Sequence, residues 1–152
     1  MKTKLGIVCA LIVCARGYAR GQNVDIYSSS QLQATGRALA KGGKSFASKD
    51  VARYGNHYTL FAMRESTGSS ELHEHEADVF VVESGKATIV TGGKMVSPHT
   101  EKAGEIRGTS IEGGERHVLQ TGDIIHIPAG VPHQLLVEKA PFEYFVIKVT
   151  GQ

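Results

Sequence analysis

No apolar run in this sequence reaches the roughly 20 residues that a membrane-spanning helix needs. One run of about half that length occupies residues 5–15, after two nearby lysines, and small residues follow it at positions 17 and 19. This order of parts is typical of a secretory signal peptide. We therefore predict a signal peptide over residues 1–19 and export to the periplasm or the extracellular space. A retained membrane anchor is the alternative interpretation.

Cysteine is equally scarce, and its absence from most of the chain excludes one kind of active site. The chain of 152 residues has only Cys9 and Cys14, and both lie within the predicted signal peptide. Residues 20–152 therefore have neither a cysteine nucleophile nor a disulfide, and no Gly-x-Ser-x-Gly sequence indicates a serine nucleophile. An exported protein without disulfides depends on its hydrophobic core, and this chain is long enough to bury one.

Neither sign of charge is in large excess. The sequence has 17 basic and 15 acidic residues, a formal net charge of +2. Three basic residues and no acidic residue lie in the predicted signal peptide, so its removal leaves 14 basic and 15 acidic residues, a net charge of −1. No basic stripe or aromatic platform remains that would bind nucleic acid. We expect neither nucleic acid nor, after signal removal, a membrane among the partners.

Only one segment has the pattern of a helix. In residues 28–43 (SSSQLQATGRALAKGG), two leucines have helical spacing, Ser29 or Ser30 can cap the first backbone amides, and paired glycines end the pattern. We predict an N-terminal arm over residues 20–45 that contains this short helix.

From Phe46 onward, the sequence changes to short runs of strand-forming residues separated by glycines. Nine such runs, of four to nine residues, have no second helical pattern between them. In the last run, residues 142–149 (FEYFVIKV), both alternating faces are largely apolar, as in a strand packed inside a two-layer fold. We predict a single all-β domain over residues 46–152, a sandwich or small barrel, with residues 96–104 as a surface loop.

The stretch ELHEHEADVFVVESG, residues 71–85, concentrates titratable groups on one face of a strand. Alternation places Glu71, His73 and His75 on the same face, with neighbouring side chains about 7 Å apart. Two imidazoles and one or two carboxylates suit a divalent Mn, Fe, Zn, Ni or Cu ion. Such an ion would also remove the cost of burying carboxylates without a partner. An exposed edge strand whose charges face water is the alternative interpretation.

A second stretch, residues 122–137 (GDIIHIPAGVPHQLLV), holds one histidine at the start of a strand. Pro128 cannot donate to a strand ladder, and Gly130 permits a backbone turn that other residues disfavour. Pro132 then restricts the backbone that leads to His133. The effect is to fix the position of one imidazole next to a tight turn.

These two stretches resemble the motifs of the cupin superfamily. The second cupin motif is a glycine, five residues, a proline, one residue, a glycine, two residues and a histidine. Four residues match it in full: Gly122, Pro128, Gly130 and His133. The two motifs together extend over residues 68–137, about half of the chain that remains after signal removal.

The first cupin motif is matched with a departure. It is a His-x-His pair, a glutamate four or five residues later, and a glycine seven beyond that. His73 and His75 supply the pair and Asp78 lies seven residues before a glycine, but Asp78 follows His75 by only three. If His73 is instead the second member, Asp78 falls at the expected five and Glu71 becomes the first member. The resemblance supports His73 and His133 as ligands, and three residues compete for the remaining positions: His75, Asp78 and Glu71.

The resemblance implies a fold and a class of function. The fold is a double-stranded β-helix, a jelly roll or cupin-like barrel with a short N-terminal helix, which holds a divalent transition metal at its wide end. The first functional hypothesis is a metal-dependent enzyme acting on a small organic molecule outside the cytoplasm. The second is a non-catalytic module that binds a metal or small ligand, and the third is a metal-free jelly roll. Cupins commonly pair by sheet extension, so the resemblance also implies a homodimer.

The remaining candidates have ordinary structural interpretations. We interpret His126 as a core or pocket-wall residue, His117 as an exposed strand residue, and Arg64 as the partner of an acid in a salt bridge.

Overall fold

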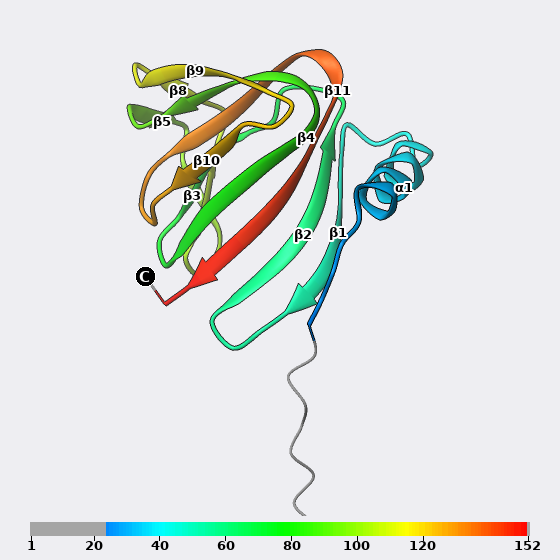
Figure 1. Ribbon diagram of the computed structural model, residues 1–152. Coiled ribbons are helices and arrows are strands. Elements are labelled where there is room, and N and C mark those ends of the chain that lie inside the picture. The colour runs from blue at the N-terminus through cyan, green and yellow to red at the C-terminus, as the bar shows by residue number, and fades with distance from the viewer. Residues whose placement is uncertain (1–23, 152) are drawn as a thin grey trace, which may run out of the picture.

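The computed structural model describes residues 24–151 (Figure 1), so the predicted signal peptide lies outside the described residues. One helix, α1, extends over Ser29–Ala40. The strands are β1 Phe46–Arg53, β2 His57–Arg64, β3 Ser70–His73, β4 Glu76–Thr91, β5 Lys94–Val96, β6 His99–Lys102, β7 Glu105–Gly108, β8 Ser110–Glu112, β9 Glu115–Gln120, β10 Ile124–Ile127 and β11 His133–Thr150. Within this part of the chain, no helix is both long and apolar enough to cross a bilayer.

The N-cap of the helix lies one or two residues before the predicted caps. Ser28 is the N-cap, and it forms a capping box with Gln31, in which each side chain accepts a hydrogen bond from the other residue's backbone amide. Gly42 and Gly43 donate their amides to the carbonyls of Leu39 and Ala40, which ends the helix near the predicted position. Helix α1 lies outside the sheets, along β1 and β2 (Figure 1).

Two long, bent strands replace four predicted short ones. Strand β4 continues through Gly85, and β11 continues through Pro141, where two separate strands each were expected. Gly85 has a φ of 87°, and a Cβ there would collide with the carbonyl oxygen of Pro141. Both strands therefore turn at the same place without ending, because glycine allows the bend and the close approach of the neighbouring backbone.

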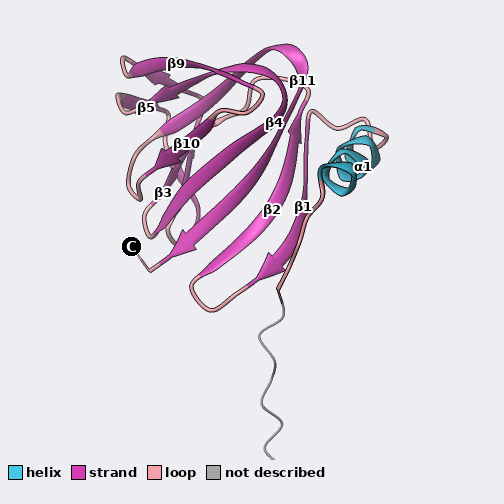
Figure 2. Cartoon of the chain, in the orientation of Figure 1, coloured by secondary structure: helices cyan, strands magenta, loops and turns pink. Residues whose placement is uncertain are grey.

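The bends divide the strands between two facing layers. The first half of β4 pairs with the second half of β11, and the second half of β4 pairs with the first half of β11. One layer has the strand order β1-β2-β11-β4-β10. The other layer has the strand order β9-β4-β11-β3-β7-β6. This antiparallel arrangement, seen in Figure 2, is a double-stranded β-helix and confirms the predicted fold class.

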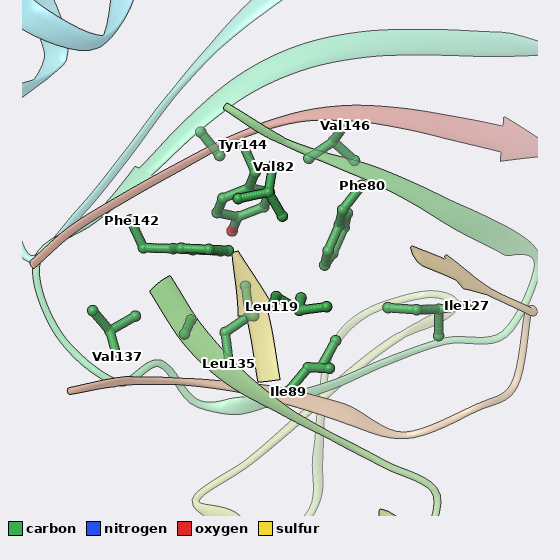
Figure 3. Packing of buried hydrophobic residues seen from close by; sticks show 12 residues of the cluster. Phe80, Val82, Ile89, Leu119, Ile127, Leu135, Val137, Phe142, Tyr144 and Val146 are labelled. Atoms are coloured by element: carbon green, nitrogen blue, oxygen red, sulfur yellow. The ribbon is translucent and has the colours of Figure 1, made fainter. Parts of the chain in front are cut away.

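The hydrophobic core fills the space between the layers (Figure 3). Phe142, Tyr144 and Val146 alternate along the second half of β11 and are all buried, as the apolar face of the predicted strand requires. They face Ile89 and Leu135 of the other layer. The next inward position on β11 is Lys148, where the lining changes from apolar to charged.

One element of the sequence prediction is wrong. Residues 96–104, predicted as a loop, contain the exposed strand β6. This strand forms because it pairs with the next strand, β7, in a hairpin that turns at residues 103–104, which the polar local sequence does not reveal.

Candidate metal centre

Two buried histidines point their Nε2 atoms into the charged end of the barrel. His73 ends β3 and His133 begins β11, and their ring centroids are 5.3 Å apart. The Nδ1 of His73 lies 2.8 Å from Glu105 Oε1, and the Nδ1 of His133 lies 3.1 Å from the carbonyl oxygen of Val131. Both acceptors place the proton on Nδ1, so each Nε2 carries a free lone pair. Among residues 24–151, neither Nε2 atom has a hydrogen-bond partner.

Backbone pairing brings these residues together. His133 pairs with Glu71 across β11 and β3, and His73 pairs with Glu105 across β3 and β7. The turn of the second motif is attached to the first motif as well, because Gly130 donates its amide to the carbonyl oxygen of His73 over 2.7 Å. Gly130 has a φ of 75°, which explains the requirement for glycine in that turn.

Two carboxylates complete the donor set. Asp78, 2% exposed, places Oδ2 at 3.3 Å from His73 Nε2 and at 3.5 Å from His133 Nε2. Glu71 Oε2 lies 3.8 Å from His73 Nε2, and Glu71, His73 and His133 each offer a donor atom within 4.8 Å of the others. Although Asp78 Oδ2 is close to both Nε2 atoms, neither is aligned with it for a hydrogen bond. Two bare imidazole nitrogens beside two carboxylate oxygens fit a divalent transition metal.

Three basic side chains balance these carboxylates. Lys148 Nζ lies 2.6 Å from Asp78 Oδ1, Arg64 Nη2 lies 2.7 Å from Glu71 Oε1, and Arg107 Nη1 lies 3.0 Å from Glu71 Oε2. Arg64 is buried, and its Nε also donates to the hydroxyl of Tyr144 over 3.0 Å. The predicted salt bridge of Arg64 is therefore one part of a buried network.

The surroundings set the charge of each acid. Burial alone would raise the pKa of Asp78, but His73 and Lys148 lower it below its ordinary value. Burial likewise opposes ionisation of Glu71, and Arg64 and Arg107 reverse this effect and lower its pKa. Both carboxylates are thus held ionised, the state in which they bind a cation.

The two histidines differ in their proton affinity. Burial lowers the pKa of His133 below its ordinary value, because the charged imidazolium would lose its hydration. Burial acts in the same direction on His73, but the neighbouring Asp78 and Glu105 outweigh it and raise the pKa of His73. His133 is therefore a neutral ligand over a wider pH range than His73.

His75 does not join this group. Its side chain is exposed, because β3 ends at His73 and the chain bends at residues 74 and 75 before β4 begins. The amide of Glu74 donates to the carbonyl oxygen of Gly104 over 2.9 Å, outside the strand pairing. The alternation that predicted three side chains on one face holds only for Glu71 and His73. Of the two alignments to the first motif, the geometry favours Glu71 and His73 with Asp78.

Sequence reasoning missed three of the site's charged residues. Glu105 and Arg107 alternate in the short strand β7, but nothing in the local sequence shows that this strand pairs with β3. The burial of Lys148 could have been inferred from the sequence, because Lys148 continues an otherwise apolar alternating face of β11. A lysine in that position is buried only with a partner.

A cavity of about 310 Å³ adjoins the carboxylates. Its lining includes Glu71, His73, Asp78 and Lys148 at the charged side. His126 and His117 are exposed and line a separate groove of about 440 Å³. His117 is exposed as predicted, and His126 lines a pocket wall, one of the two positions predicted for it, and not the core.

Comparison with known proteins agrees with the motifs and the barrel. Residues 103–148 match the Cupin domain family. The matched segment contains all four residues of the second motif. No protein of curated function has a significantly similar sequence. The resemblance on which the ligand prediction rested is therefore confirmed at the level of family and fold.

Solved cupin-like structures share the fold at low sequence identity. A conserved protein of Klebsiella pneumoniae with a double-stranded β-helix domain superposes with a TM-score of 0.58 and 16% identity, covering 86% of this chain and 93% of that one. The salicylate 1,2-dioxygenase of Pseudoaminobacter salicylatoxidans, in complex with gentisate, superposes with a TM-score of 0.54 and 16% identity, covering 80% of this chain and 31% of that one. The DMSP lyase DddQ of Ruegeria pomeroyi superposes with a TM-score of 0.51 and 17% identity, covering 72% of this chain and 49% of that one.

Proposed function

We propose that this cupin is a metal-dependent enzyme that acts on a small organic molecule outside the cytoplasm. The observation that carries the proposal is the pair of buried Nε2 atoms, of His73 and His133, that have no hydrogen-bond partner and face Asp78. A buried polar atom without a partner costs free energy, and a metal ion would satisfy both nitrogens at once. The proposed ligands are His73, His133, Asp78 and Glu71, and the ion is Mn, Fe, Zn, Ni or Cu.

Each protein group has a separate task in this proposal. Glu105 orients the imidazole of His73, and the carbonyl oxygen of Val131 orients that of His133. When bound, the metal would act as a Lewis acid or lower the pKa of a bound water. The cavity beside the carboxylates gives a substrate of modest size access to the centre. The exposed His75 has no part in it.

The structural neighbours support an enzymatic function without identifying the reaction. A dioxygenase and a lyase have the same fold. Because identity to both is below 20%, the choice among oxygenation, isomerisation and bond cleavage is not carried over to this chain.

A non-catalytic binding module is the second candidate. It is favoured by the charge balance of the site, since Lys148 neutralises Asp78, and Arg64 and Arg107 lie against Glu71. A site that is already balanced can hold a ligand without a tightly bound reactive ion.

We further propose, from residues 1–19 and the cupin resemblance, that the protein is exported and forms a homodimer.

The proposal is tested by metal content followed by a substrate screen. The protein is purified without added metal, analysed for bound elements, and titrated with Mn(II), Fe(II), Zn(II), Ni(II) and Cu(II). Stoichiometric binding of at least one ion is expected, and no uptake of any ion would contradict the proposal. The loaded protein is then screened against small organic molecules, with oxygen consumption measured for the Fe(II) and Mn(II) forms. Tight metal binding without turnover of any compound would favour the binding module.

A further inference from the structure

Lys148 is a buried cation with unused hydrogen-bonding capacity. It is 8% exposed, and its Nζ lies 2.6 Å from Asp78 Oδ1 but has no aligned hydrogen-bond partner. An ammonium group has three donors, and a buried charge with unsatisfied donors is costly. Because Lys148 lines the cavity, an acceptor on a bound ligand could satisfy these donors.

The cavity has an excess of positive charge. Five basic and four acidic side chains line it, which gives a net charge of +1 with neutral histidine. A divalent ion at the proposed centre would bring this to +3. Asp78 would then share its negative charge between the ion and Lys148. In a partly desolvated cavity, such an excess favours a ligand with a negative charge.

One wall of the cavity, next to the charged groups, is apolar. It includes inward-facing residues of three adjacent strands: Leu60 and Ala62 of β2, Val146 of β11 and Phe80 of β4. Val146 precedes Lys148 on the same face of β11, so the apolar wall leads directly to the ammonium group. A cavity of about 310 Å³ is at the small end of the range for ligand sites. The lining therefore suits a compact apolar body with one anionic group.

We propose that the metal-loaded cavity binds a small apolar carboxylate whose carboxylate group is held by Lys148 Nζ beside the metal centre. This inference rests on the proposed function and names its substrate class. Lys148 is then the residue that selects an acid over a neutral molecule of the same shape.

The test compares acids with their amides. The Zn(II)-loaded protein is titrated calorimetrically with benzoate and benzamide, and with butyrate and butyramide. We expect at least one acid to bind about tenfold more tightly than its amide, the effect of one charge-assisted hydrogen bond. Lys148→Met should abolish this preference. Lys139→Met is the matched control, because Lys139 is an exposed lysine of the same strand that does not line the cavity, and it should retain the preference.

Two results would overturn the inference: equal binding of acid and amide by the parent protein, or a preference that survives Lys148→Met. Zinc affinity is measured separately for every variant, so that a failure to bind metal, which contradicts the proposed function, is distinguished from a failure to select the acid. If Lys148→Met does not fold, a crystal of the loaded parent protein with 4-bromobenzoate decides the question. A carboxylate oxygen within about 3 Å of Lys148 Nζ supports the inference, and any other position, or no bound molecule, contradicts it.

Discussion

Gly130 donates its backbone amide to the backbone carbonyl oxygen of His73 over 2.7 Å. This bond joins the turn of the second motif to the strand end of the first, and it fixes the origin of both histidine side chains at the same end of the barrel. The turn leads within a few residues to His133, whose own side chain hydrogen-bonds the carbonyl oxygen of Val131. Backbone contacts thus hold the two histidines at one end of the barrel.

Removal of either buried histidine should strongly weaken metal binding. We expect His73→Ala and His133→Ala each to weaken Zn(II) binding by about 100-fold or more, because each removes a direct ligand. The measurement is competition against a chelator of known affinity. His75→Ala is the matched control and should bind Zn(II) like the parent protein, since His75 is exposed outside the group. A loss of affinity in His75→Ala equal to that in His73→Ala would show that the ligand assignment is wrong.

Glu105 should act through His73. Glu105→Gln replaces the carboxylate that accepts from His73 Nδ1, and we expect metal affinity to fall about 10-fold to 100-fold because the imidazole is less basic and less firmly oriented. The same chelator competition measures it. Glu101→Gln removes an exposed acid that contacts Arg107 and should change the affinity little. Equal affinity in Glu105→Gln and the parent protein would rule out this supporting role.

Arg64 should contribute to the stability of the metal-free protein. Arg64→Met removes the partner of Glu71 and of the Tyr144 hydroxyl, and it leaves part of a buried network uncompensated. We expect a loss of about 3 kcal/mol in the free energy of unfolding, measured by urea denaturation with a chelator present. Arg116→Met, at an exposed position of β9, serves as the control and should have little effect. A similar small effect for Arg64→Met would indicate that the network is not tightly formed.

Acid should destabilise the metal-free protein through Asp78 and Glu71. Their pKa values in the folded state lie below the ordinary values of 3.8 and 4.5. Since the unfolded chain then takes up protons first, the stabilisation is present above these ordinary values and is lost as the pH falls through the folded-state pKa values. Urea denaturation between about pH 6 and pH 2 should show this loss.

Variants identify the groups responsible for the acid effect. Glu71→Gln should give a shallower decline with pH, because one depressed pKa is removed. Glu138→Gln, at an exposed position of β11, should leave the profile unchanged. A Glu71→Gln profile that is parallel to that of the parent protein would contradict the assignment.

Much of the fold was predictable because its signals are local. The capping serines and terminal glycines located the helix to within two residues, and the glycine-separated strand runs indicated an all-β fold. Gly122 specifies the turn before β10, and Pro128 and Gly130 specify the turn after it, so their spacing identified His133 as a candidate. The continuation of β4 through Gly85 was missed, since a glycine in a strand pattern indicates a bend or an end equally well.

The sequence by itself determined most of the segments that form strands, although not β6. It also determined which turn carries His133 and that His73 and Asp78 lie near an apolar strand. Only the tertiary structure decided which side chains meet. It excluded His75 by bending the chain after β3, and it brought in Glu105 through β7 and Lys148 through β11. The physical reason is that backbone preference acts over a few neighbouring residues, whereas the convergence of charged side chains depends on strand register between distant segments.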